Sequence, residues 1–234
     1  MRATDDGLPQ GQAKVAAVRS MFDAIAPRYD RVNRLLTFGM DAGWRRRTVA
    51  ALGLPPGSVV VDVAAGTGDL CRELEASGHR AAGVDMAFRM LTHARTSAPL
   101  VQADALCLPV PNGRADGITC GFALRNFVDL GGFLAEAARA LRPGGRLALL
   151  EVAAPANPVL RAGHGLYFGH VVPVVGGWLS DRAAYSYLPR SVAYLPPVPA
   201  LLQLVRDAGF EAVERRLLST GIVQLVTATR QRAR

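Results

Sequence analysis

The chain has 234 residues, of which 50% are hydrophobic, and this composition excludes a protein that stays unfolded for want of a core. The formal net charge of +8 would favour anionic membranes or nucleic acid as partners, but Lys14 is the only lysine, and genome-wide arginine usage can account for much of the excess. The longest apolar stretch, 166–179, is broken by glycine and proline and is shorter than the roughly 20 residues that cross a bilayer, which excludes a membrane span.

The N-terminal residues 1–12 are polar and lack the charged and apolar regions of a signal peptide, so we predict a disordered leader followed by one domain, 13–234. The three cysteines, Cys71, Cys107 and Cys120, have no metal-ligand spacing. We therefore expect reduced, structural thiols in a cytoplasmic protein, and no metal site.

Two helices are predicted before the first strand, over 13–26 and 30–52, where they would form a cap. Strands and helices then alternate until 155–196, whose prolines, glycines and aromatics predict an inserted substrate lobe. The expected strands are 59–63, 80–85, 99–103, 115–120, 147–152, 211–218 and 221–228, and the expected helices are 69–77, 86–96, 130–141 and 197–208. This order predicts an α/β, Rossmann-like fold with a seven-stranded, mainly parallel sheet and a final antiparallel pair.

The most informative segment is a glycine turn that follows a run of valines at 59–63. Gly66 and Gly68 allow the backbone to turn without a Cβ and to approach a ligand closely. A dinucleotide fingerprint would place a third glycine at position 71, where this chain has Cys71, so a tightly held pyrophosphate is disfavoured.

Two acidic residues accompany this turn. Asp62 lies in the first strand, and Asp85 ends the next one, where a carboxylate can accept both hydroxyls of a ribose. The combined pattern resembles the cofactor site of the Rossmann-like class I S-adenosylmethionine (SAM) methyltransferases. The alternative is a glycine-rich turn of another α/β protein that binds no SAM.

Residues 21–45 resemble the N-terminal signature of the quinone-biosynthesis C-methyltransferases, and further matches extend the resemblance to about residues 20–228. That family converts demethylmenaquinol to menaquinol and methylates a polyprenyl benzoquinol. The resemblance implies a prenylated quinol substrate and a long-tailed ligand for the apolar lobe. The lobe would alternatively cover the sheet or form a homodimer contact.

The resemblance also implies roles for individual residues. The cofactor-binding set is Asp62, Gly66, Thr67, Gly68, Asp85, Met86, Asp104, Ala105 and Gly121. The catalytic set is Tyr29, Arg125 and Asn126, with a structural ion pair and helix cap as the rival interpretation of the last two. His164 and His170 are rival bases, although histidines among apolar residues are more often structural.

Several positions depart from the family pattern, among them Asp41, where histidine is frequent, and Ala153, where serine is usual. A methyltransferase of another phenolic metabolite therefore stays open as an alternative, as does a SAM-binding scaffold without activity. Nucleic-acid methylation is suggested by charge alone, since no element to hold a flipped base is present, and we expect no nucleic-acid partner. The run Arg45–Arg47 is either a solvated helix face, a phosphate contact or, with the lobe, a peripheral contact with the inner face of the cell membrane.

Overall fold

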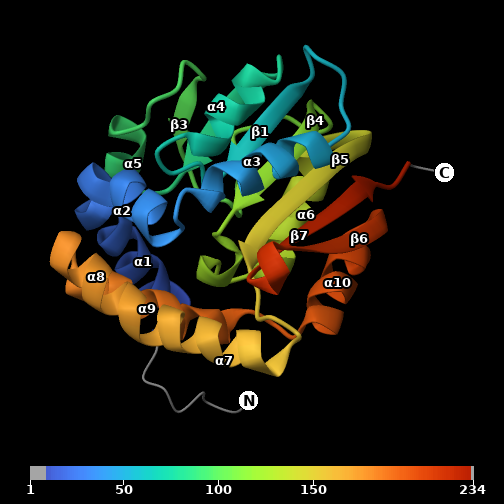
Figure 1. Ribbon diagram of the computed structural model, residues 1–234. Helices are drawn as coiled ribbons and strands as arrows, with labels where there is room; N and C mark the ends of the chain where they lie inside the picture. The colour runs from blue at the N-terminus through green and yellow to red at the C-terminus, as the bar shows by residue number, and fades with distance from the viewer. Residues whose placement is uncertain (1–8, 233–234) are drawn as a thin grey trace.

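The computed structural model describes residues 9–232. The leader predicted over 1–12 therefore lies mostly outside the described residues, and helix α1 (Gly11–Ile25) begins within its last two positions. Figure 1 shows a central twisted sheet with helices on both faces and a further group of helices along the bottom of the view, past the ends of the strands.

The sheet has seven strands in the order β3-β2-β1-β4-β5-β7-β6. The strands are β1 (Val59–Val63), β2 (Arg80–Asp85), β3 (Leu100–Gln102), β4 (Ala115–Gly121), β5 (Leu141–Val152), β6 (Phe210–Leu218) and β7 (Val223–Arg230). β1 to β5 run parallel, and β7 pairs antiparallel with both β5 and β6, so the predicted fold class is confirmed. The strand order reverses between β1 and β4, which is where open α/β sheets bind ligands at the carboxyl ends of their strands.

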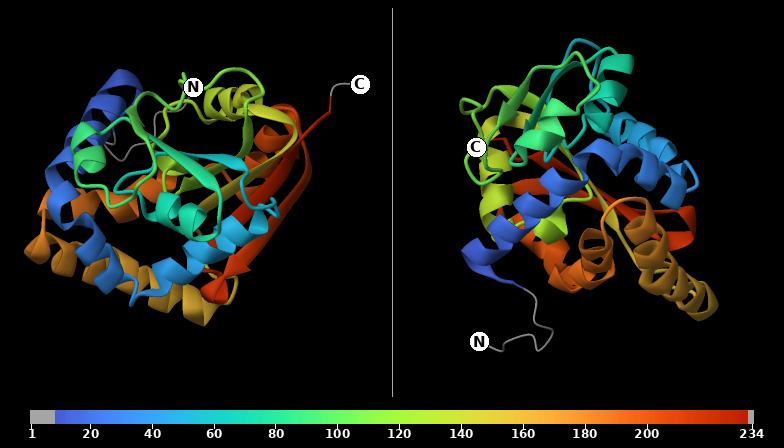
Figure 2. Two further views of the ribbon diagram at one scale, coloured as in Figure 1. Left: turned by 90° about the horizontal axis from the view of Figure 1, so that it is seen from above. Right: turned by 90° about the vertical axis from the view of Figure 1, so that its left-hand side faces the viewer.

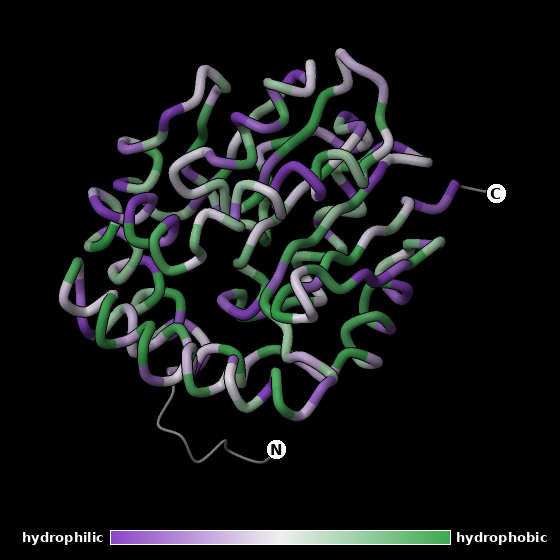
Figure 3. The backbone as a smooth tube through the Cα atoms, in the orientation of Figure 1, coloured by the Kyte–Doolittle hydropathy of each residue, from purple (hydrophilic) through white to green (hydrophobic). Residues whose placement is uncertain are grey.

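Two layers of helices bury the two faces of the sheet. On one face, α3 (Met40–Ala51) and α4 (Asp69–Ala76) place Val49, Leu52 and Leu74 against β1. On the other face, α6 (Leu130–Ala140) and α10 (Val198–Asp207) pack Phe133, Leu134 and Val205 onto β4 and β5. Figure 3 shows that apolar residues concentrate along the central strands, as expected for a parallel sheet covered on both sides.

The prediction of one helix over 30–52 was wrong, because the segment is divided into α2 (Tyr29–Leu36) and α3. Phe38 and Gly39 separate them with φ values of 52° and 73°, a left-handed backbone that no helix can continue through. A short 3₁₀ turn, Ala26–Arg28, joins α1 to α2. The predicted helix 86–96 is also shorter, since α5 covers only Phe88–Thr92.

The lobe at 155–196 is helical. It comprises α7 (Pro158–Leu166), a π-helical turn (Tyr167–Val171), α8 (Val172–Leu179) and α9 (Arg182–Ser191). In Figures 1 and 2, α8 and α9 lie beside α1 and α2, although the two groups are far apart in the sequence. Among the described residues, no helix combines the length and the hydrophobicity that a bilayer span requires.

Helix α1 is attached to the loop that follows β4 through Lys14. Its Nζ donates hydrogen bonds of 2.9 Å to the carbonyl oxygens of Arg125 and Phe127 and lies 3.6 Å from the centre of the Tyr194 ring. Burial lowers the pKa of Lys14 to about 8. The attachment places the N-terminal helix over the ends of β2 and β4.

Candidate active site

Three adjoining cavities lie at the carboxyl ends of the parallel strands. The first, of about 110 Å³, is closed on one side by α1. The second, of about 460 Å³, lies between α2 and the lobe, and the third, of about 40 Å³, lies above the glycine turn. Tyr29 and Phe122 line all three, so these two residues mark the point where the cavities meet.

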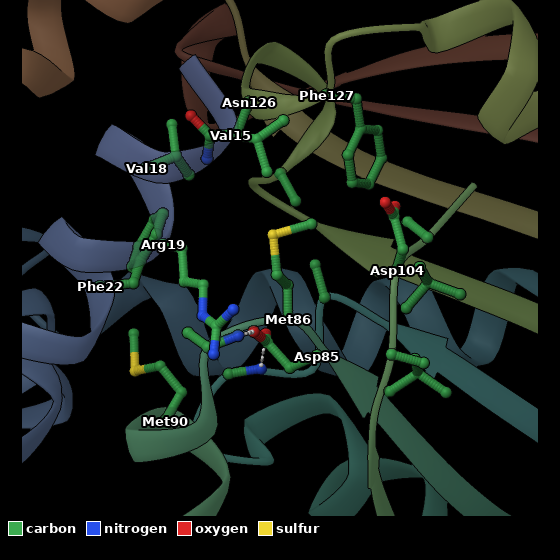
Figure 4. Close-up of a pocket in the computed structure, with 18 of the residues that line it drawn as sticks. Val15, Val18, Arg19, Phe22, Asp85, Met86, Met90, Asp104, Asn126 and Phe127 are labelled. Carbon is green, nitrogen blue, oxygen red and sulfur yellow. Dashed lines mark hydrogen bonds between the residues drawn. The ribbon is translucent and has the colours of Figure 1, made fainter. Parts of the chain in front are cut away.

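Asp85 is the central polar residue of the first cavity. Its carboxylate accepts hydrogen bonds of 2.8 Å from the backbone amides of Gly66 and Ala87, which fixes its orientation. Burial raises its pKa, and those two amides oppose the increase. Figure 4 shows Asp85 facing the cavity, with Arg19 and Phe22 of α1 opposite it. The remaining carboxylate lone pairs are available to ligand hydroxyls.

The rest of the first cavity combines an apolar wall with a second carboxylate. Met86, Ala105 and Gly121 line it, and Asp104 points into it across from Asp85 (Figure 4). The Asp104 carboxylate accepts the Leu106 amide at 2.9 Å. An apolar slot with acidic residues at its ends suits a nucleoside, whose base is flat and whose polar atoms lie at its edges.

The third cavity contains Asp62, Gly66 and Thr67. Asp62 is 1% exposed and accepts a 2.7 Å hydrogen bond from the Thr119 hydroxyl. Burial raises its pKa to about 7, although Thr119 and the charge of Arg45 oppose this. A carboxyl group in that state gains most from a cationic ligand, which would favour its ionised form.

The glycines of the turn differ in what they do. Gly66 has φ +56°, and a Cβ there would meet no atom within 4 Å, so its surface is open to the cavities. Gly68 lines none of the three cavities; at φ +80° its Cβ would lie 2.8 Å from Thr96. Gly68 therefore serves the turn and its packing, whereas Gly66 exposes backbone to a ligand.

Two residues without glycine's freedom adopt left-handed backbone at this edge. Ala64 follows β1 with φ 57°, and Phe122 follows β4 with φ 58°. Such conformations cost of order 1 kcal/mol or more and concentrate at ligand sites. Both residues line the cavities, and the sequence patterns gave no indication of this strain.

The second cavity is mostly apolar, with polar groups near the meeting point. Its walls come from α1, α2, α3 and the helices of the lobe, and they include Ile25, Leu36, Leu160, Phe168, Val172 and Leu188. Tyr29, Asp41, Arg45 and Arg125 provide the polar groups. The Asp41 carboxylate accepts the Thr37 hydroxyl and pairs with Arg45, and this pairing, opposed by burial, lowers the pKa of Asp41.

Arg125 lies in the second cavity as part of a buried ion pair. Its Nη1 pairs with Glu151, its Nε donates to the Ser191 hydroxyl at 3.1 Å, and its own amide donates to Glu151 at 3.3 Å. Its Nη2 has no partner among the described residues. The side chain therefore combines the structural ion pair with a free donor group at the cavity wall.

Asn126 and Tyr29 occupy different places. Asn126 lines the first cavity, and its side-chain oxygen accepts the Tyr187 hydroxyl at 3.3 Å. Burial raises the pKa of the Tyr29 hydroxyl, while the charges of Arg45 and Arg125 oppose this, so Tyr29 is a hydrogen-bond donor near neutral pH. The structure thus places all three predicted catalytic residues at these cavities.

The two histidines differ in their surroundings, and so do the residues of the arginine run. His164 lines the second cavity and stacks on Phe168, whereas His170 is exposed. Arg45 is buried and pairs with Asp41 and Asp69, so it belongs to the site and not to a solvated helix face. Within residues 9–232, no three histidine, cysteine or acidic side chains gather as metal ligands would.

This strand order, with a glycine turn between a buried strand and its helix and an acid at the end of the next strand, defines a class I methyltransferase fold. A SAM-dependent methyltransferase from Thermotoga maritima has a similar structure, with a TM-score of 0.64 over 91% of this chain and 99% of that one, at 19% identity. The model of the ubiE/COQ5 methyltransferase family matches residues 10–230. The chain belongs to the ubiE/COQ5 methyltransferase family, as its N-terminal signature predicted.

Curated relatives agree with this assignment. The demethylmenaquinone methyltransferase of Deinococcus radiodurans is 45% identical over 88% of this chain and 90% of its own length. The ubiquinone/menaquinone biosynthesis C-methyltransferase UbiE of Syntrophotalea carbinolica is 40% identical over 91% of this chain and 93% of its own.

Three residues of the site escaped sequence reasoning. Glu151, the partner of Arg125, was given no role from the sequence, and Asp30, whose carboxylate accepts the Thr67 hydroxyl, lies 37 residues from its partner. Tyr185 gave no signal because a tyrosine in a helical lobe is usually core. In the folded chain Tyr185 lines the second cavity, whereas Glu151 and Asp30 contact the site through Arg125 and Thr67.

Proposed function

We propose that the protein transfers a methyl group from SAM to a ring carbon of a prenylated quinol, with demethylmenaquinol as the substrate. The observation that carries this proposal is the pair of connected cavities, one suited to a nucleoside and one large and apolar, that meet at Tyr29. The relatives named demethylmenaquinone methyltransferase support the choice of substrate.

The residues present fit SAM. Asp85 would hold the ribose, Asp104 the adenine amino group, and Gly66, Thr67 and Asp62 the methionine end, as their positions in the first and third cavities allow. Met86 and Ala105 would pack on the base, and Gly121 leaves room between the two cavities. When bound, SAM supplies a methyl group that is already electrophilic.

The protein's part is to make the quinol carbon nucleophilic and to exclude water. A phenol with a pKa near 10 is mostly neutral at neutral pH, so a nearby cation is needed to favour its phenolate. Arg125 provides that charge at the cavity wall, and Tyr29 can donate to the same oxygen. Asn126, held by Tyr187, would orient the substrate or a water from the first cavity.

Asp62 makes SAM binding depend on pH. Because the pKa of Asp62 is raised to about 7, its carboxyl group is largely protonated below that pH, and the SAM cation should release this proton. We expect SAM affinity to increase from pH 6 to pH 8, with proton uptake by the buffer, and Asp62→Asn to remove both effects. Calorimetry in buffers of different ionisation enthalpy measures this. The folding stability of the ligand-free protein has the opposite pH dependence. Because the pKa of Asp62 is higher in the folded chain than in the unfolded one, the stability that Asp62 contributes is lost as pH rises through 7.

The outer surface of the lobe supports a membrane contact. Trp178 is 86% exposed, Val159 79% and Val174 71%, and the segment 153–180 contains Arg161 but no acidic residue. Helix α7, which contains Val159, also lines the second cavity, so a prenyl tail could pass from lipid into the site. A homodimer contact would cover the same surface.

A vesicle experiment distinguishes these occupants. Trp178 fluorescence should shift to the blue when the protein binds vesicles of phosphatidylglycerol and phosphatidylcholine, and Trp178→Phe should show little shift, because Trp44 is buried. Partial release by salt would indicate a charge contribution, and salt-independent binding would indicate the apolar surface alone. No binding at any ionic strength, with concentration-dependent sedimentation, would favour the dimer.

The test of the function itself is an assay with labelled SAM and reduced demethylmenaquinone, compared with a ubiquinone precursor. We expect transfer to the naphthoquinol. Transfer only to an unprenylated phenol would favour the alternative metabolite methyltransferase, and SAM binding without any transfer would favour a scaffold.

A further inference from the structure

The second cavity contains a polar group that the mechanism above does not use. Tyr185, in α9, is 1% exposed, and its hydroxyl has no hydrogen-bond partner among residues 9–232. Buried hydroxyls almost always have a partner, since leaving one unpaired costs stability. An unpaired hydroxyl at a cavity wall therefore indicates that a bound ligand supplies its hydrogen-bond partner.

The position of Tyr185 is fixed by close packing. A Cβ on Gly176 of α8 would lie 2.3 Å from the Tyr185 ring, so only glycine at 176 leaves space for it. Ile25, Val32 and Val172 belong to the same buried cluster. The ring is thus held in one place, and its hydroxyl cannot turn to solvent.

Tyr185 lies on the substrate side of the meeting point. It lines the second cavity but neither of the others, whereas its neighbour Tyr29 lines all three. Burial and the proximity of Tyr29 raise the pKa of Tyr185 far above its usual range, so its hydroxyl keeps its proton and acts as a donor. A phenol that stays neutral cannot serve as a base, which leaves a positioning role.

We propose that Tyr185 donates a hydrogen bond to the quinol oxygen farther from the cofactor, and that it thereby selects hydroquinones over monophenols. This inference rests on the proposed function. A quinol has two ring oxygens. Arg125 and Tyr29 would interact with the oxygen beside the methylated carbon, and Tyr185 would donate a hydrogen bond to the other oxygen. Sites with a buried hydrogen-bonding group discriminate strongly against ligands that leave it unpaired.

The test compares two ligands and two variants. Binding of a prenylated naphthohydroquinone and of the matching prenylated naphthol, which lacks the distal oxygen, is measured in the presence of S-adenosylhomocysteine. The unaltered protein should prefer the hydroquinone by on the order of tenfold, and Tyr185→Phe should lose most of that preference. Its KM for the quinol should rise while SAM affinity is kept and the melting temperature is kept or raised, because phenylalanine fits the same space without the unpaired hydroxyl. Tyr194→Phe, outside the cavities, should keep the preference.

The outcomes are distinguishable. A Tyr185→Phe protein that is folded, active and as selective as the unaltered protein overturns the inference alone. Equal losses for both ligands, together with a lowered melting temperature, indicate a structural tyrosine and also overturn it. Absence of turnover by the unaltered protein on every prenylated quinol overturns the proposed function and, with it, the role of Tyr185.

Discussion

Replacing Arg125 and Glu151 together by glutamine should lower turnover by on the order of 100-fold or more, while SAM affinity stays nearly unchanged. The double change is needed because Arg125→Ala alone would leave Glu151, 0% exposed, as an unpaired buried charge, which costs about 3 to 5 kcal/mol. Two amides of similar size can bond to each other, so the fold should survive. The loss of turnover follows from the loss of the cation beside the developing phenolate.

A pH profile separates this role from a structural one. Raising the pH ionises the quinol in solution and should partly restore turnover of the double variant, which a merely misfolded site would not allow. Glu151→Gln alone keeps the cation but leaves it buried without its counter-ion, so we expect a lower melting temperature, with turnover of the folded protein within several-fold of normal. Arg142→Ala, which removes a surface ion pair with Asp116, is the matched arginine control. A folded double variant with full activity would show that Arg125 has no catalytic role.

Asp85→Ala should weaken SAM binding by about 1 to 3 kcal/mol, roughly 5- to 150-fold, as measured by calorimetry. The variant removes the acceptor for the ribose hydroxyls. It also leaves the amides of Gly66 and Ala87 without their partner, so we expect a value near the upper end and a lower melting temperature.

Asp116 provides the control for that second effect. Its carboxylate also accepts a backbone amide, that of Val59 at 2.7 Å, but it lies at the opposite end of the strands and lines none of the three cavities. Asp116→Ala should lose stability without losing SAM affinity. Equal SAM affinity in the Asp85 and Asp116 variants would place the cofactor elsewhere.

The sheet could be predicted because its strands are short apolar runs separated by glycine and proline, and such local patterns survive folding. The break in the N-terminal cap could not be predicted, because Phe38 adopts a left-handed backbone conformation that phenylalanine does not normally favour. The lobe was predicted as an insertion, but its helices were missed, since proline and glycine normally argue against helix. Pro158 is tolerated because it stands in the first turn of α7.

The position of a residue at the cavities could be predicted where the sequence places it at the end of a strand, as for Asp85 beside the glycine turn. Ion pairs between distant residues could not be predicted. The partner of Arg125 is 26 residues away, and Arg45 was interpreted as part of an exposed run although it is buried in an ion pair with Asp69. A sequence shows the sign of each charge, but it does not show whether the charged side chain is buried. The structure shows the ion pair of Arg125 with Glu151 and places Arg125 at the second cavity, and its catalytic role stays a prediction.

Phe22 and Tyr29 form a wall that the first and second cavities share. Their rings meet edge-on, with centroids 6.0 Å apart, so a ligand that fixes one ring also restricts the other. The ligand that binds first therefore bears part of the loss of conformational entropy of the two rings, and the second ligand loses less entropy when it binds. The two affinities become linked, and each ligand must change the affinity for the other by the same factor. Cooperativity between a water-soluble nucleoside and a lipid would thus arise from two aromatic rings, without any larger movement of the fold.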